Sequence, residues 1–250
     1  MSNFAPVCPT QILRGLKADN ALGNYHLLLA HDVAAKPDEY AEIFDGFDGQ
    51  IILDNSVIEL GTAVDLDMIV AAAKVVRPTT TVLPDVMLKQ QSTIEACKAA
   101  LPIWTEAFQK AGLQPQFMIA PQGLTQLAWV RCAEAFAEDP EINFWSIPRN
   151  CVRNFHTRQG LPEILHALNP NRKIHMLGFS DMLLDDVITA KHPYVWGIDS
   201  AVPVRAISQD ILMSFSSFSA MPPRGNWWET AEYDPAMKSN IALAKQWFKS

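Results

Sequence analysis

Polar side chains able to do chemistry recur directly after the short apolar segments of this 250-residue chain. Three are carboxylates, since Asp54 follows QIIL, Asp85 follows TTVLP and Asp199 follows YVWGI. Gln122 follows QFMIAP, and Arg149 follows INFWSIP. One carboxylate can attack an anomeric carbon to give a covalent glycosyl–enzyme, while another acts as general acid or base. A third carboxylate and a carboxamide can bind a purine edge, so the set predicts glycosyl chemistry.

Short apolar segments alternate with amphipathic helical patterns along the chain. The expected strands are 25–30, 50–53, 80–83, 116–120, 142–147, 173–177 and 194–198. The expected helices are 65–76, 88–112, 124–138, 161–168, 181–191, 206–215 and a C-terminal helix at 235–248. This alternation is typical of a parallel sheet, either a closed barrel or an open doubly wound sheet. Because a (β/α)8 barrel typically needs about 250 residues, we expect a single-domain α/β TIM barrel over residues 1–250.

Three segments of the chain depart from the regular alternation of strands and helices. Only seven strands are clear, and the eighth is expected at 202–205 or at 10–13. Pro102 is expected to kink or split the helix at 88–112, because proline removes a backbone donor. Residues 214–233 have neither a helical nor a strand period and are expected to form a loop or lid.

A parallel barrel would bring the polar side chains together. The carboxyl ends of its strands open onto one face, which is where barrel active sites lie. A single Asp after a strand is more often a helix N-cap or a turn residue. Asp54, however, is followed by Asn55 and Ser56, which already supply good capping groups. The recurrence after several strands therefore favours an active site over capping.

The charge of the chain limits the kinds of partner. A formal net charge of −7 argues against a general nucleic-acid binder, whose surface is usually basic, but it allows a local basic patch. Such a patch could come from Arg149, Arg153, Arg158 and Arg172, with His156 among them, or these residues could form an ordinary solvated loop.

The cysteines and the apolar segments indicate an intracellular protein without a metal. The four cysteines form no C-x-x-C pair and no Cys/His group at zinc spacing, so we expect no zinc site and a reduced compartment. The N-terminus has no charged start followed by an apolar run, and no apolar stretch approaches about 18 residues. We therefore expect a cytoplasmic protein (host cytoplasm if viral) with no membrane partner.

The ordered motifs resemble those of one enzyme superfamily. Six motifs within residues 25–205 resemble those of the tRNA-guanine transglycosylase superfamily. In order along the chain they are LDNSVIELG, LPDV, APQG, SIPRN, HMLGF and GIDSAVPVR. They look most similar to its compact, zinc-free phage members, the 7-deazaguanine DNA transglycosylases. The C-terminal Cys/His zinc subdomain of the tRNA enzymes has no counterpart in this sequence, which favours DNA over tRNA as the acceptor.

The resemblance implies roles for individual residues. Asp199 begins a D-x-x-x-P-x-R run and corresponds to the nucleophile. Asp54 corresponds to the general acid/base, in a segment that lacks the family's glycines. The implied substrate-binding residues are Asp85 and Gln122, which read the base, with Gly123, Ser56, Arg149, Leu177, Gly178 and Arg205.

The resemblance thus implies exchange of guanine in DNA for a free 7-deazaguanine base, with retention and without a metal or redox cofactor. The alternatives are a tRNA-guanine transglycosylase acting on RNA and a non-catalytic barrel subunit that binds nucleic acid. An aldolase or sugar-phosphate isomerase is a further alternative, but no strand-end Lys and no late Gly cluster supports it. The sequence leaves the incoming base and the oligomeric state open.

Several other residues have two interpretations each. His31 could bind substrate or be a hydrogen-bonded structural histidine, whereas His175 is expected to pack or bond internally. Glu59 could be a second acid near Asp54, or it could cap or pair nearby. Trp227 and Trp228, close to Arg224 in sequence, could stack on unpaired bases or anchor the C-terminal helix.

Overall fold

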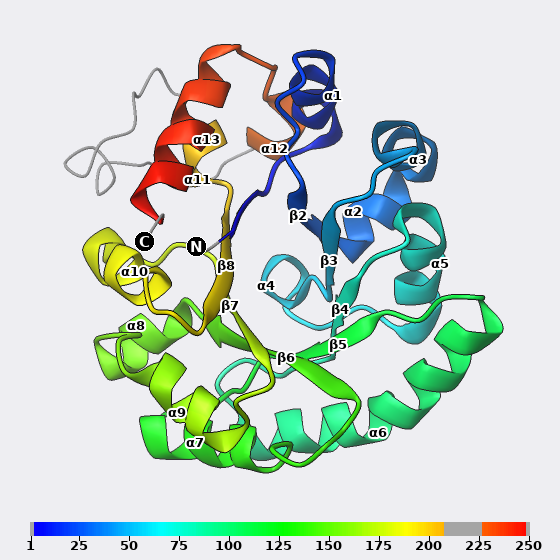
Figure 1. The fold of residues 1–250 in the computed structure, drawn as a ribbon. Helices are drawn as coiled ribbons and strands as arrows, with labels where there is room; N and C mark the ends of the chain where they lie inside the picture. Colours follow the sequence, from blue (N-terminus) through cyan, green and yellow to red (C-terminus); the bar gives the residue numbers. More distant parts are fainter. Residues whose placement is uncertain (1–2, 208–226, 249–250) are drawn as a thin grey trace.

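A computed structural model describes residues 3–207 and 227–248 of the chain. Eight parallel strands form one sheet in the order β1-β8-β7-β6-β5-β4-β3-β2, curled into a nearly closed barrel (Figure 1). The strands are β1 (Asn3–Pro6), β2 (Tyr25–Leu29), β3 (Gln50–Asp54), β4 (Thr80–Val82), β5 (Gln116–Ile119), β6 (Ile142–Pro148), β7 (Lys173–Leu177) and β8 (Val195–Ser200). The predicted (β/α)8 TIM-barrel fold is therefore confirmed.

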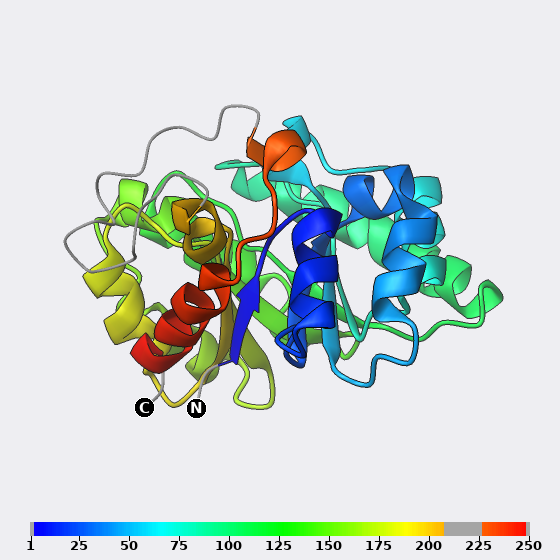
Figure 2. The same ribbon diagram turned by 90° about the horizontal axis from the view of Figure 1, so that it is seen from above.

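Helices alternate with the strands and surround them (Figures 1 and 2). They are α1 (Thr10–Ala18), α2 (Ala30–Ala35), α3 (Pro37–Phe44), α4 (Val57–Leu60), α5 (Leu66–Val76), α6 (Gln90–Lys110), α7 (Gln126–Glu134), α8 (Asn150–Phe155), α9 (Leu161–Leu168), α10 (Leu183–Ala190), α11 (Val202–Ile207), α12 (Trp227–Thr230) and α13 (Ala236–Trp247). None of the helices in the described residues is both long enough and apolar enough to cross a membrane.

The eighth strand is β1, and both predicted positions for it are wrong. Residues 10–13 begin helix α1, and 202–205 lie in helix α11. The buried residues of α1 are Thr10, Ile12, Leu13 and Leu16. This spacing places them on one face of a helix and does not follow the alternation of a strand. The real strand is only four residues long and ends in Pro6, so its sequence resembles a turn.

Strand β1 is held in the barrel from two sides. It pairs with β8, where Ala5 lies opposite Asp199, and it packs beside β2, although no hydrogen-bonded ladder joins β1 to β2 among the described residues. Helix α13 packs on β1, and the rings of Phe4, Phe179 and Phe248 form one cluster there. Burial of these rings helps to hold the short strand β1 against the rest of the barrel.

Helix α6 is continuous, so the predicted split at Pro102 does not occur. Proline inside a helix typically costs about 3 kcal/mol, because it loses a hydrogen bond and clashes with the preceding turn. Pro102 lies on the exposed face, whereas Cys97, Leu101 and Trp104 bury the opposite face on both sides of it. Packing against the barrel therefore holds both halves of α6 in one helix.

The C-terminal predictions are confirmed in part. Helix α13 matches the expected helix at 235–248, and helix α11 begins earlier than the helix expected at 206–215. Residues 214–226 of the expected loop or lid lie outside the described residues. Its later part contains the short helix α12, whose Trp227 is buried.

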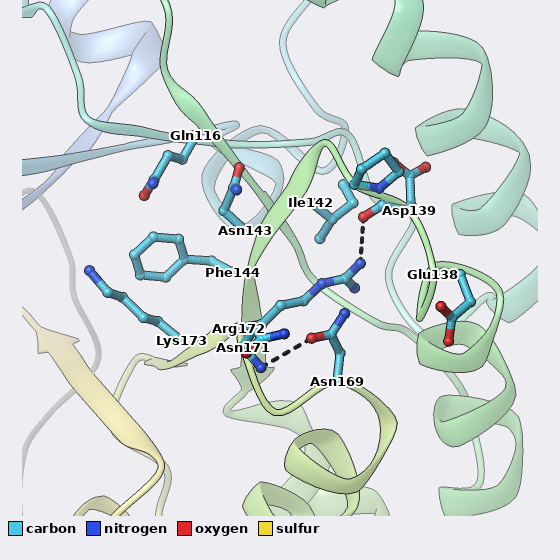
Figure 3. A pocket seen from close by; sticks show the side chains of 11 residues that line it. Gln116, Glu138, Asp139, Ile142, Asn143, Phe144, Asn169, Asn171, Arg172 and Lys173 are labelled. Carbon is cyan, nitrogen blue, oxygen red and sulfur yellow. Dashed lines mark hydrogen bonds between the residues drawn. The ribbon is translucent and has the colours of Figure 1, made fainter.

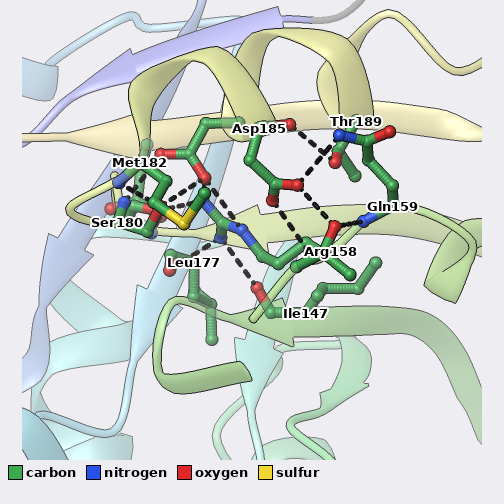
Figure 4. A network of polar contacts seen from close by, with 12 residues as sticks. Ile147, Arg158, Gln159, Leu177, Ser180, Met182, Asp185 and Thr189 are labelled. Carbon is green, nitrogen blue, oxygen red and sulfur yellow. Dashed lines mark hydrogen bonds and ion pairs between the residues drawn. The ribbon is translucent and has the colours of Figure 1, made fainter. Parts of the chain in front are cut away.

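A buried cation ties the carboxyl ends of β6 and β7 together (Figure 4). Arg158 has no exposed surface and forms an ion pair and hydrogen bonds with the equally buried Asp186. Its guanidinium also donates to the carbonyl oxygens of Ile147 at 3.2 Å and Gly178 at 2.9 Å. These carbonyls lie at strand ends, so Arg158 helps to fix the backbone beside the site.

Replacing Arg158 by Met should lower the free energy of unfolding by about 3–5 kcal/mol, because it leaves Asp186 buried without its cation. Urea unfolding followed by circular dichroism would measure this. Arg153→Met is the matched control, since the Arg153–Asp181 pair is exposed and should contribute less than about 1 kcal/mol. Equal stability losses in the two variants would contradict the prediction.

Candidate active site

One cavity of about 340 Å³ opens at the carboxyl ends of the strands. This volume falls in the range of small-molecule sites, which is about 300–1,000 Å³. Every strand contributes a lining residue at or just after its carboxyl end: Val7, Leu29, Asp54, Asp85, Gln122, Arg149, Gly178 and Asp199. The five polar residues first singled out in the sequence therefore share one cavity, as expected for a barrel active site.

Asp199 is held at the end of β8 by two donors that bind the same carboxylate oxygen. The Nε2 atom of His175 lies 3.0 Å from Oδ1, and the backbone N–H of Gly178 donates to Oδ1 at 3.0 Å. Within the described part of the chain, Oδ2 accepts no hydrogen bond. The cavity therefore contains a carboxylate with one anchored oxygen and one oxygen available for attack.

Asp54 ends β3 in a different electrostatic environment. Burial raises its pKa well above the usual value, and the neighbouring charge of Glu59 adds to this rise. The backbone N–H of Ser56 donates to Oδ1 at 2.7 Å and lowers the pKa, whereas Asp85 and Asp199 raise it further. A carboxyl group in such surroundings keeps its proton to a higher pH than an ordinary aspartate does, and the protonated form is the one that a general acid requires.

Asp85 and Gln122 form a fixed polar edge within the cavity. The side-chain amides of Asn55 and Gln122 donate to the two oxygens of Asp85 at 2.8 Å and 2.7 Å. The backbone N–H of Leu88 donates to Oε1 of Gln122 at 3.0 Å, and Asn150 Nδ2 donates to the same atom at 3.3 Å. Because a backbone N–H can only donate, it sets Oε1 as the acceptor and turns Nε2 towards Asp85.

Burial raises the pKa of Asp85 to about 6, against the lowering effect of its hydrogen bonds from Asn55 and Gln122. Asp85 is therefore ionised above about pH 6, and each of its oxygens has a lone pair left to accept from a ligand. The amide of Gln122 has a second N–H that can donate. The edge thus presents acceptors beside a donor.

Two of the predicted substrate-binding residues do not belong to the described lining of this cavity. A Cβ atom at Gly123 would lie 2.3 Å from the backbone nitrogen of Trp129, so glycine lets the end of β5 pack against helix α7. Ser56 is fully buried with a left-handed φ of 62°, and its hydroxyl accepts from the backbone N–H of His31 at 3.4 Å. Both residues shape the backbone next to the site.

The remaining predicted residues line the cavity. Leu177 and Gly178 come from the end of β7, and Arg205 comes from helix α11. Gly178 has a left-handed φ of 70°, a conformation that glycine adopts without strain. The Cδ atom of Arg149 lies 3.2 Å from where a Cβ of Gly178 would be, so this glycine also leaves room for the arginine.

The arginine-rich stretch is divided between two environments. Arg149 and Arg153 line the cavity, and Arg205 joins them from elsewhere in the chain. Arg158 and Arg172 are buried, so neither belongs to a surface patch or to a solvated loop, contrary to both expectations. The cations of the lining are therefore Arg149, Arg153 and Arg205, around acids from four other positions.

Several residues with two interpretations now have a defined place. Glu59 is exposed, lines the cavity and lies near enough to Asp54 for its charge to raise the pKa of that residue. His31 is outside the described lining and lies 3.6 Å from Asp32. Trp227 is buried in the core against Trp228, which supports the anchoring role.

The sequence interpretation missed Asn55, Asn150 and the partnership of Tyr25 with His175. The sequence predicts only a capping role for Asn55, but its side-chain amide donates to Asp85. The internal bonding expected of His175 is confirmed, since it is fully buried between Asp199 and the Tyr25 hydroxyl, which lies 2.7 Å from Nδ1. A repeated pattern of polar residues inside apolar strands was the available signal.

A second cavity of about 270 Å³ lies at the opposite, amino-terminal end of the strands (Figure 3). Arg172 donates to the carbonyl oxygen of Asp139 at 2.6 Å, and its guanidinium lies 4.4 Å from the ring centroid of Trp145. Residues at this end of a barrel usually serve stability. The cavity at the carboxyl ends of the strands therefore remains the candidate active site.

Comparisons with known proteins add no identification. No family model matches the sequence, and no curated protein matches it. Within residues 3–207 and 227–248, no group of three or more His, Cys, Asp or Glu residues is arranged to hold a metal ion.

Proposed function

We propose that this chain exchanges guanine in DNA for a free 7-deazaguanine base through a covalent glycosyl ester on Asp199. The observation that carries the proposal is the sharing of one cavity by Asp199, Asp54 and the Asp85–Gln122 edge. Asp199 has an unbonded oxygen within the described residues, and Asp54 has a raised pKa. Two carboxyl groups in different environments can divide the roles of nucleophile and acid.

The first half-reaction releases guanine. Oδ2 of Asp199 attacks C1′ of the nucleoside, and the bond between C1′ and the base nitrogen breaks with its electrons going to guanine. The Asp54 carboxyl group supplies the proton that makes guanine a neutral leaving group. The sugar is then held as an ester of Asp199, and Asp54 is a carboxylate.

The second half-reaction restores the enzyme. The ring nitrogen of the incoming base attacks C1′ from the face that guanine left, and Asp54 takes the proton from this nitrogen. The C1′–Oδ2 bond breaks, and its electrons return to Asp199. Two displacements at C1′ give overall retention.

The cavity edge fits a guanine-type base. Guanine offers donors at its N1 and N2 positions beside the O6 acceptor. The ionised Asp85 accepts from donors, and the second N–H of Gln122 can donate to O6. Adenine has an amino donor where guanine has O6, so it would leave Gln122 without an acceptor.

The acceptor that we propose is a nucleic-acid strand with its target nucleotide turned out of the stack. Base-modifying enzymes reach their target in this way. Arg149, Arg153 and Arg205 in the lining can balance phosphate charge near the acidic residues. We propose DNA from the motif resemblance, and RNA is the alternative that the same experiment tests.

The proposal is tested by incubating the chain with labelled guanine or 7-deazaguanines and with DNA or tRNA in turn. We expect label to enter DNA while an equal amount of guanine is released. Label entering tRNA alone would make RNA the acceptor. Binding of both nucleic acids without incorporation of any label would refute exchange and favour a non-catalytic barrel.

Replacing Asp85 by Asn should raise KM for the free base by about 10–100-fold, because an acceptor of the N1 and N2 donors is lost at the edge. In the wild type, the same KM should rise as the pH falls below about 6, when Asp85 takes up a proton. The base concentration needed for half-maximal exchange, measured from pH 5 to 8, checks both effects. A KM that is unchanged in the variant and constant with pH would contradict this role of Asp85.

A further inference from the structure

We propose that Tyr25 and His175 form a hydrogen-bond relay that positions Asp199 for attack, with His175 as the neutral Nε2–H tautomer. This inference rests on the proposed function, in which Asp199 is the nucleophile. It assigns roles to two buried side chains: His175 of β7, which bonds to Asp199, and Tyr25 of β2, which bonds to His175. Tyr25 and His175 are positioning residues, because neither belongs to the described lining of the cavity.

The direction of the relay follows from the donors and acceptors present. The Tyr25 hydroxyl lies 2.7 Å from Nδ1 of His175, and Nε2 of His175 lies 3.0 Å from Oδ1 of Asp199. Burial and the charge of Asp199 raise the pKa of Tyr25 well above its usual value, so its hydroxyl keeps its proton. This proton can be donated to Nδ1, which places the ring hydrogen on Nε2 facing the carboxylate.

The barrel interior is built to admit the phenol of Tyr25. A Cβ atom at Gly197 would lie only 2.6 Å from the Tyr25 hydroxyl oxygen. Gly197 pairs with His175 in the β7–β8 ladder, two residues before Asp199. The glycine therefore leaves, beside the histidine, the space through which Tyr25 reaches across the barrel.

The relay and the backbone of Gly178 act on the same oxygen. Two donors on Oδ1 restrict rotation of the carboxylate and orient Oδ2 as the attacking atom. In the ester, Oδ1 becomes the carbonyl oxygen and can still accept both hydrogen bonds. When the incoming base displaces Asp199, the same donors stabilise the charge that returns to the carboxylate.

Three variants separate positioning from simple filling of space. His175→Leu removes both hydrogen bonds, and His175→Gln offers an N–H to Asp199 and a carbonyl oxygen to Tyr25. Tyr25→Phe removes only the donor that sets the tautomer. We expect His175→Leu to lower kcat by about 10²–10³-fold, with KM for the free base within about twofold of the wild type. The kcat of His175→Gln should be at least about tenfold higher than that of His175→Leu. The kcat of Tyr25→Phe should lie between those of the two His175 variants.

The relay is overturned if His175→Leu has the kcat of the wild type, whether its KM for the free base is unchanged or raised. Thermal unfolding identifies variants that fail to fold. If a variant fails to fold, the relay can still be tested by a measurement on the wild-type protein. Nitrogen-15 NMR of labelled histidine, with His175 assigned through the Gln variant or by through-bond correlation in the wild type, reports which ring nitrogen carries the proton.

From the two hydrogen bonds of the ring, we expect the hydrogen on Nε2 of His175 and none on Nδ1. A hydrogen on Nδ1 would overturn the relay, whether or not the protein exchanges bases. A wild type that carries the hydrogen on Nε2 but incorporates no label would instead refute the proposed function, while the hydrogen-bond arrangement would stand. The two failures are therefore distinguishable.

Discussion

Replacing Asp199 by Ala is expected to reduce base exchange by about 10⁴-fold or more, because the nucleophile forms the covalent bond on which both half-reactions depend. Asp199→Asn should be nearly as inactive, since a carboxamide keeps the shape but attacks C1′ poorly. The measurement is the initial rate of entry of labelled base into DNA. Retained binding of the free base would show that the cavity persists in both variants.

A matched control for this result is Asp48→Asn, at an exposed position in the turn before β3. It removes the same charge without touching the cavity, and it should exchange bases at the wild-type rate. Exchange by Asp199→Ala at a rate within tenfold of this control would remove Asp199 from the mechanism.

Replacing Asp54 by Asn is expected to lower kcat by about 10²–10⁴-fold, because the departing guanine loses its proton donor. Burial and the charge of Glu59 raise the pKa of Asp54, and a general acid works only while it is protonated. Exchange by the wild type should therefore decline as the pH rises through this raised pKa. The kcat profile of Asp54→Asn should lack this decline.

Glu59→Gln tests the cause of the raised pKa. Removing the Glu59 charge lowers the pKa of Asp54, so the alkaline decline in kcat should move to lower pH. The size of the shift is measured by comparing the two profiles under one buffer series. A decline at the wild-type pH in Glu59→Gln would contradict the electrostatic assignment, even if Asp54→Asn is inactive.

The sequence was sufficient to predict how the barrel gathers its polar residues. Asp54, Asp85 and Asp199 follow apolar segments, and parallel strands bring such positions to one face whatever their distance along the chain. This inference needed only the period and order of the elements. Small errors in strand ends did not affect it, because the lining residues lie at or just beyond those ends.

The missed features depend on contacts that span the barrel. Tyr25 and His175 are 150 residues apart, and their meeting requires closure of the sheet and the space left by Gly197. Strand β1 was missed because packing of Phe4 against Phe179 and Phe248 compensates for a short, proline-ended segment. No local pattern carries this information.

Single motifs also did not distinguish binding residues from backbone-shaping ones. Gly123 follows Gln122 in the motif, but its lack of a Cβ serves the approach of helix α7. Arg158 lies in an arginine-rich stretch and yet is fully buried with Asp186. In both cases the decisive neighbour comes from another element of the fold.

The most direct test of the mechanism is isolation of the covalent intermediate. The protein is incubated with DNA in the absence of free base, quenched in acid, digested with trypsin and nuclease, and analysed by mass spectrometry. We predict a sugar-phosphate adduct on the tryptic peptide of residues 192–205, with fragmentation placing it on Asp199. An adduct on a peptide that contains Asp54, or base exchange that proceeds with no adduct at any quench time, would contradict the account.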